Sequence, residues 1–389
     1  MQRKLYRMKR LVVALFLLLP LAGLVTQGVA SQTTDSVVVL GYNELGMHCM
    51  NEDFSDLGIL PPFNTLRAQV IDRSGSEPRI LTTGVTVRYS IPGNTHSADK
   101  TNFWLFAQKL FGVKLAPNIG LTGNGLTGTM TLTGQNDWQA TGIPITPLND
   151  AGREDPYPLS YITVLRQGQV VGQTRAVVPV SWEISCNLCH TSLPTAQDIL
   201  RKHDALHGTT LMQQRPVLCA SCHADNALGT SGQPGVPNLS RAMHNAHASR
   251  MAQANLQNSC YACHPGIRAQ CQRDVHFSKG ITCTTCHGDM TAVANPARRP
   301  WIDEPRCGSC HQRQGFEFEQ TNTLYKNSVG HENVHCAACH GAPHAITPTV
   351  TEADNLQAIA LQTNPGRINQ CTVCHRTQPN ETFPHRRGD

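Results

Sequence analysis

The chain has 389 residues, enough for two or three domains, and only 15% of them are charged, against about 25% in an average soluble protein. Its formal net charge of +5 comes from five basic side chains in the first ten residues, because residues 31–389 hold 27 basic and 27 acidic side chains. This neutrality argues against a nucleic-acid binder with a basic surface and against a wholly disordered chain, so the 16 cysteines and 18 histidines are the informative feature.

Residues 1–30 have the pattern of a secretory signal. A basic segment precedes the apolar run Leu11–Val25, and Gly28-Val29-Ala30 offers small residues for cleavage after Ala30. A membrane-spanning helix needs about 20 apolar residues, whereas this run is shorter and contains Pro20. We therefore expect an exported protein, periplasmic or extracellular, with no transmembrane span in its mature part. An uncleaved membrane anchor is the alternative.

Residues 31–182 predict a β-rich domain. One short helix is expected at Phe103–Phe111, among runs rich in Val, Ile and Thr that are separated by Gly, Pro, Asn and Asp. Six of these runs predict strands, at 36–40, 66–71, 84–91, 128–132, 161–167 and 174–180. Short strands with such turns between them are typical of a β-sandwich-like fold.

Residues 183–389 contain one repeated unit, Cys-x-x-Cys-His, in seven copies that use 14 of the 16 cysteines. This pattern is the attachment site of c-type haem. Two thiols three residues apart add to the two vinyl groups of one porphyrin edge, and the next histidine gives its imidazole to the iron. The sequence therefore predicts seven covalent haem c groups. Their attachment sites are Cys186, Cys189 and His190; Cys219, Cys222 and His223; Cys260, Cys263 and His264; Cys283, Cys286 and His287; Cys307, Cys310 and His311; Cys336, Cys339 and His340; and Cys371, Cys374 and His375.

Three other kinds of cysteine site explain the pattern less well. A disulfide framework is common in exported proteins, but it gives no reason for a histidine after every second cysteine. Zinc ribbons also use paired cysteines, yet they do not require that histidine seven times. A thioredoxin-type redox motif needs one copy in a βαβ context, which is missing here.

With these seven motifs, residues 183–389 resemble the bacterial multihaem c-type cytochromes of periplasmic or extracellular electron transfer. The resemblance implies low-spin irons with two histidine ligands, haems in a continuous chain, and redox proteins or extracellular acceptors as partners. About 30 residues per motif cannot build a large core from side chains alone. We therefore expect a mostly irregular, short-helix cytochrome c domain at 183–389 whose core is haem, following a β-sandwich-like domain at 31–182.

Eleven histidines outside the motifs are candidates for the second axial position. A helix is predicted from Thr195, with Asp198 completing a capping box and Gly208 as its stop, and a second helix is predicted at about 240–255. Each of these helices carries two histidines on one face, His203 and His207 in the first helix and His244 and His247 in the second. The expected ligands are His203, His207, His244, His247, His276, His331, His335, His344 and, far upstream, His48. His96 and His385 stay outside this set, and a thioether from Met47 or Met50 is the alternative to His48.

Cys49 and Cys271 are left over after the motifs are counted. In an oxidising compartment they can form a disulfide. The alternative is two buried thiols, because sequence does not show whether their Cα atoms approach closely enough.

Three functions fit this sequence. The first is an electron-transfer protein, with mostly bis-histidine irons and no catalytic residue, and it is the one we expect. The second is a self-assembling subunit of an extracellular cytochrome filament, since a heterologous contact that does not close gives a fibre. The third is a multihaem oxidoreductase with one open iron. The surplus of histidines argues against a forced open position.

Overall fold

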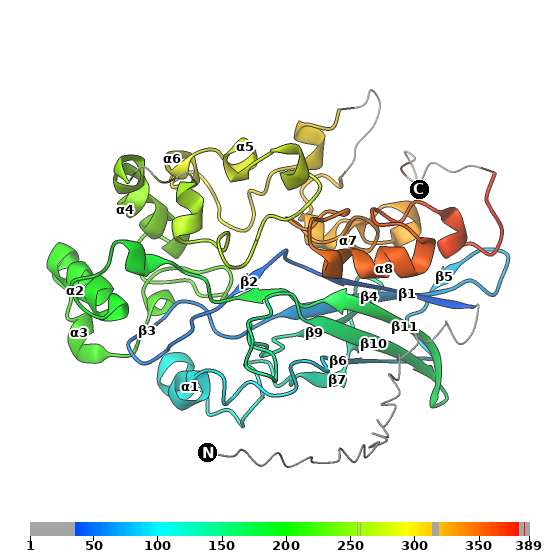
Figure 1. Ribbon diagram of the computed structural model, residues 1–389, viewed down its shortest axis with the longest axis horizontal. Coiled ribbons are helices and arrows are strands. Elements are labelled where there is room, and N and C mark those ends of the chain that lie inside the picture. Colours follow the sequence, from blue (N-terminus) through cyan, green and yellow to red (C-terminus); the bar gives the residue numbers. More distant parts are fainter. Residues whose placement is uncertain (1–35, 255, 257, 313–318, 381–384, 386–389) are drawn as a thin grey trace, which may run out of the picture. The chain divides into compact units, whose positions relative to one another are not determined.

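The computed structural model describes residues 36–254, 256, 258–312, 319–380 and 385. The expected secretory signal at 1–30 lies outside the described residues. Two antiparallel sheets form from the N-terminal half (Figure 1). The first has the order β1 (Val37–Asn43), β4 (Thr65–Asp72), β9 (Trp138–Thr141) and β8 (Thr131–Leu132), with β5 (Arg79–Ile80) also paired to β4. The second has the order β11 (Gln169–Val177), β10 (Leu159–Arg166), β6 (Thr86–Ser90) and β7 (Thr127–Thr129).

The inner faces of the two sheets share one apolar core. Val39 and Val70 of the first sheet pack in the same cluster as Val87 and Ile162 of the second. In β6 buried and exposed residues alternate, as they do in a strand with one face in water. The sequence-predicted runs at 36–40, 66–71, 84–91, 128–132, 161–167 and 174–180 all overlap strands.

Strands β1 and β4 differ from β6 because every one of their residues is buried. Their second face is covered by the motif-containing half of the chain. Val38, Leu40 and Tyr42 form a cluster with Ala337 and Ala338 of helix α7 (Cys336–His340). Figure 1 shows α7 over this face of the first sheet, with α8 (Glu352–Gln362) beside it, where Gln357 of α8 binds Gly41 of β1 and Thr174 of β11. The first sheet of the β-rich half therefore forms a packing surface for the motif-containing half.

Two short parallel strand pairs are also present, and the second of them joins the halves. β2 (His48–Cys49) pairs with β12 (Val180–Ser181), and β3 (Leu57–Gly58) pairs with β13 (Val217–Leu218). β13 ends directly before the second motif. The described residues consequently all belong to one compact unit, although they comprise two halves of different composition.

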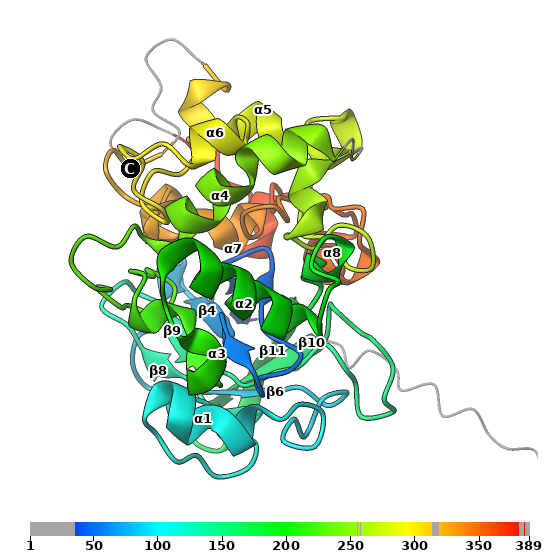
Figure 2. The same ribbon diagram turned by 90° about the vertical axis from the view of Figure 1, so that its left-hand side faces the viewer.

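The helices are mostly short. The N-terminal half has α1 (Phe103–Phe111), with the bounds that the sequence predicts. The motif half has α2 (Thr195–His207), α3 (Leu211–Gln214), α4 (Leu239–Gln253), α5 (Cys283–His287) and α6 (Met290–Val293), in addition to α7 and α8. Figure 1 shows α1, α2 and α3 on the same side of the unit, at the left of the view, and this side faces the viewer in Figure 2.

The predicted end of α2 is confirmed and its predicted start is partly wrong. Gly208 caps the helix in the left-handed conformation, with φ 64°. The residue before the helix is Pro194, and Thr195 is already helical, so the expected capping box with Asp198 does not form. The carboxylate of Asp198 binds other partners, which are described below. The second predicted helix corresponds to α4, whose start is capped by the side chain of Asn238.

Candidate haem-binding site

Each motif folds into a helical turn that begins at or next to its first cysteine. In five motifs the turn is a 3-10 helix, and in the motifs of α5 and α7 it is α-helical. The N–H of His190 donates to the carbonyl of Cys186 at 3.0 Å, and the N–H of His264 donates to that of Cys260 at 2.8 Å. The turn thus gathers two thiols and one imidazole into a local unit, as attachment of one haem requires.

Every motif histidine lies opposite a second histidine. In these seven pairs the ring centroids are 5.9 to 6.4 Å apart. The pairs are His190 with His247, His223 with His203, His264 with His244, His287 with His344, His311 with His276, His340 with His385, and His375 with His331. Two imidazoles on opposite sides of one metal, at nitrogen–metal distances of about 2 Å, have centroids about 6 Å apart. The spacing fits one iron per pair.

The outer ring nitrogens of many of these histidines are already engaged. Carbonyl and carboxylate oxygens only accept, so Nδ1 of the histidine donates to them and Nε2 stays available to a metal. The contacts are His223 with Pro237 O at 2.8 Å, His244 with Ser240 O at 2.7 Å, His247 with Met243 O at 2.7 Å, His276 with Asp274 Oδ2 at 3.0 Å, and His190 with Asp198 Oδ2 at 3.3 Å. Ligand histidines in metal sites are typically oriented in this way.

Helix α4 serves two motifs at once. His244 and His247 are three residues apart, yet His244 pairs with the third motif and His247 with the first.

Burial lowers the pKa of His264 to about 4. Burial likewise lowers the pKa of His340 and of His344 to about 4. These imidazoles are therefore neutral near pH 7, the form that binds metal.

The motifs are neighbours in a row. In several motifs burial raises the pKa of one thiol, and the charge of a cysteine in another motif raises the same pKa further. Such an effect requires the two cysteines to lie close together, so it identifies neighbouring motifs. The affected thiols and their neighbours are Cys219 with Cys186, Cys263 with Cys186 and Cys189, Cys286 with Cys310, Cys307 with Cys336, and Cys339 with Cys374. Cys260 and Cys283 share a hydrogen bond. The resulting order is second, first, third, fourth, fifth, sixth and seventh motif.

A cavity of about 3050 Å³ runs past the third to seventh motifs. Binding sites for drug-sized ligands have volumes of about 300–1,000 Å³, so this space suits several bulky groups rather than one. Its walls include Cys260, Cys283, Cys307, Cys336 and Cys371, as well as residues of the β-rich half such as Met47. Thiols, paired imidazoles and a large cavity together fit covalent haem c.

Six of the nine histidines expected as second axial ligands lie beside a motif histidine. The other three, His48, His207 and His335, have other neighbours. His48 lies with Nε2 3.2 Å from Asn43 Oδ1, and His207 lies with its ring 4.8 Å from the ring of His203. His335 lies with Nε2 2.8 Å from the carbonyl of Gln135. The seventh partner is His385, which sequence reasoning left out because nothing in the sequence around it indicates that it lies beside His340.

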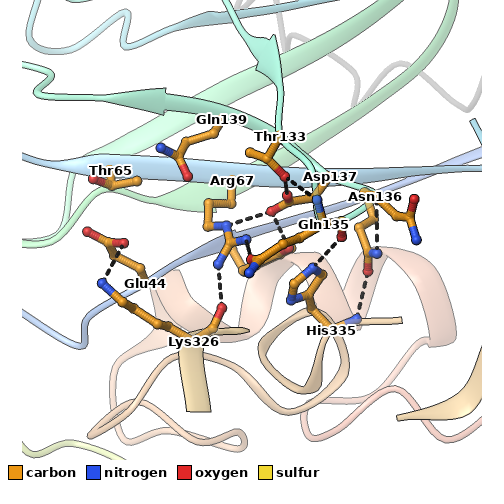
Figure 3. Close-up of polar contacts among 12 residues, drawn as sticks. Glu44, Thr65, Arg67, Thr133, Gln135, Asn136, Asp137, Gln139, Lys326 and His335 are labelled. Atoms are coloured by element: carbon orange, nitrogen blue, oxygen red, sulfur yellow. Dashed lines mark hydrogen bonds and ion pairs between the residues drawn. The ribbon is translucent and has the colours of Figure 1, made fainter. Parts of the chain in front are cut away.

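The surroundings of His335 show how the β-rich half supports the sixth motif (Figure 3). Arg67 is 2% exposed, and its Nε lies 2.5 Å from Asp137 Oδ2. The same guanidinium donates to the carbonyl of Lys326 and, at 3.0 Å, to Gln135 Oε1. This buried network fixes the segment that leads into Cys336. Sequence reasoning missed Arg67 and Asp137, because nothing local marks an isolated Arg or Asp in a strand as buried.

Two further buried charged residues make contacts between distant parts of the chain, and the first of them joins the halves. Arg273 is 1% exposed; its Nε and Nη2 bind the carboxylate of Asp354 at 2.6 and 2.8 Å, and its Nη1 donates to the carbonyl of Gly46. Its guanidinium also lies 4.8 Å from the ring centre of Tyr157. The carboxylate of Glu183, 3% exposed, accepts hydrogen bonds from the backbone N–H groups of residues 266–269.

Cys49 and Cys271 are both free, partly buried thiols in the structure. They lie near one another, since the pKa of Cys49 is raised mainly by burial and further by Cys271. The sulfur of Cys271 is 3.6 Å from Nδ1 of His344. Of the two alternatives for these cysteines, the structure has the thiols.

Comparison with known proteins supports a c-type cytochrome. Residues 290–341, which include the fifth and sixth motifs, match the family model of cytochrome c554 and c-prime. No curated protein matches the chain. The structure of Pseudomonas fluorescens alkylpurine DNA glycosylase AlkC bound to DNA containing an abasic site analog aligns with 37% of this chain and 30% of its own at 11% identity. The TM-score of 0.17 is too low to carry an argument. In the part of the chain that the structure describes, no helix has the length and apolarity to cross a membrane.

Proposed function

We propose that the protein is an exported electron carrier with seven covalent haem c groups, each held by two histidines. Haem c supplies a reversible one-electron change at iron and, with several groups in a row, transfer from one to the next. The residues of this chain attach the groups through 14 thiols, hold each iron between two imidazoles and keep the array packed against the first sheet.

The observation that carries the proposal is the complete pairing of histidines. Each of the seven motif histidines has a different second histidine at a distance that suits one metal between them. An oxidoreductase with an open iron requires at least one motif histidine without such a partner. The pairing therefore favours a carrier over an enzyme.

The order of the motifs suggests where electrons enter and leave. The row ends at the second motif on one side and at the seventh on the other. We infer that redox partner proteins or extracellular acceptors dock near these two ends, in the periplasm or outside the cell. In this proposal haem is the core of residues 183–389, and the β-sandwich-like half is a rigid support for the array.

Intact mass spectrometry of the natively secreted protein tests the proposal. We expect the mass of the chain after Ala30 plus seven haem groups, with a Soret band and only low-spin ferric signals. The bare polypeptide mass without Soret absorption contradicts it. A high-spin iron that binds cyanide or nitrite points to the oxidoreductase, and filaments in electron micrographs point to a self-assembling subunit.

A further inference from the structure

We infer that Asp198 is a positioning residue that lowers the reduction potential of the iron of the first motif. The inference rests on the proposed function and concerns how the row is tuned. Asp198 lies on α2, whose His203 faces the second motif, while its own carboxylate reaches His190 of the first motif.

The site around Asp198 is built and enclosed. The side chain of Asp198 is fully buried. Its Oδ2 lies 3.3 Å from Nδ1 of His190 and 2.6 Å from Nζ of Lys202. Its Oδ1 accepts from the guanidinium of Arg201 at 2.8 Å and from the hydroxyl of Ser192. A capping role does not explain this arrangement, because the carboxylate makes none of the capping-box contacts.

Most other ligand histidines with a defined outer contact face a neutral acceptor. His223, His244 and His247 donate to backbone carbonyls, and His203 donates to the hydroxyl of Thr209 at 2.9 Å. A buried carboxylate at His190 therefore distinguishes the first motif from its two neighbours in the row, the second and the third. The fifth motif has a similar contact, between Asp274 and His276 at 3.0 Å.

The sign of the effect follows from the charge. A carboxylate that accepts from Nδ1 increases the electron donation of the imidazole to its metal, and this stabilises the more positive ferric state. Lys202 and Arg201 oppose this effect, because they withdraw negative charge from the same two oxygens. Removing Asp198 and removing its cations should therefore move the potential in opposite directions.

The test is a redox titration of the full holoprotein, followed by absorption and by electron paramagnetic resonance. Asp198→Asn keeps the shape and a hydrogen-bond acceptor but removes the charge, so one of the seven potentials should rise while six stay in place. The double variant Arg201→Gln with Lys202→Gln should lower the same potential. Thr209→Val, at the neutral contact of His203, is the control and should move the potential of the second motif less.

The affected iron is identified with His247→Ala, which should abolish the low-spin signal of the first motif only. Unchanged potentials in both the Asp198→Asn and the double variant overturn the inference, and so do shifts of the same sign. A merely structural role of Asp198 alters haem content or stability without this sign reversal. If the mass spectrum shows that the native protein carries no haem, the proposed function itself fails. That result differs from unchanged potentials in a haem-loaded protein, which contradict only the role of Asp198.

Discussion

Replacement of Arg273 by Met should destabilise the protein by about 3–5 kcal/mol, the range measured when one partner of a buried ion pair is removed. The change leaves the carboxylate of Asp354, 9% exposed, without its two guanidinium donors. It also removes the guanidinium that stacks on Tyr157 and donates to the carbonyl of Gly46. A buried carbonyl left without its donor costs about 1–3 kcal/mol.

Urea unfolding of the holoprotein, followed by far-ultraviolet circular dichroism, measures this loss. Arg299→Met is the matched control, because Arg299 pairs with Asp303 on the surface with 69% of its side chain exposed, and exposed pairs contribute little. Adding Asp354→Leu to Arg273→Met should restore part of the stability, because no buried charge is then left unpaired. If the urea midpoint of Arg273→Met coincides with that of Arg299→Met, the buried contacts of Arg273 do not hold the two halves together.

Three further outcomes are expected. His385→Ala should convert one iron to a high-spin or water-bound form in the absorption and resonance spectra, whereas His207→Ala should leave all seven irons low-spin; identical spectra for both variants contradict the pairing. Glu183→Gln should lower the unfolding midpoint, because four backbone N–H groups lose a charged acceptor, and hydrogen exchange of residues 266–269 should accelerate. Burial opposes ionisation of Asp150, but hydrogen bonds from Lys100 and the segment at 95 lower its pKa to about 2. Its contribution to stability is therefore present above about pH 4 and is lost as the pH falls toward 2, and Asp150→Asn should remove this part of the acid dependence in thermal unfolding.

The sequence by itself determined what depends on neighbouring residues. The seven motifs are local by their chemistry, since both thiols and the first imidazole lie within five residues. Helix α1 has its predicted bounds because apolar spacing and Gly112, at φ 73°, act within a few turns. The end of α2 at Gly208 follows for the same reason. A short strand such as β9 was missed because four residues give too brief an alternation to detect.

Only the tertiary structure decided which histidine faces which motif. His244 and His247 are neighbours on one helix, yet they serve the third and the first motif, and His385 reaches His340 from the far end of the chain. The same holds for the burial of both faces of β1, which depends on α7 about 300 residues later. A second axial ligand is chosen by distance and direction in space, and neither is encoded in the spacing along the chain.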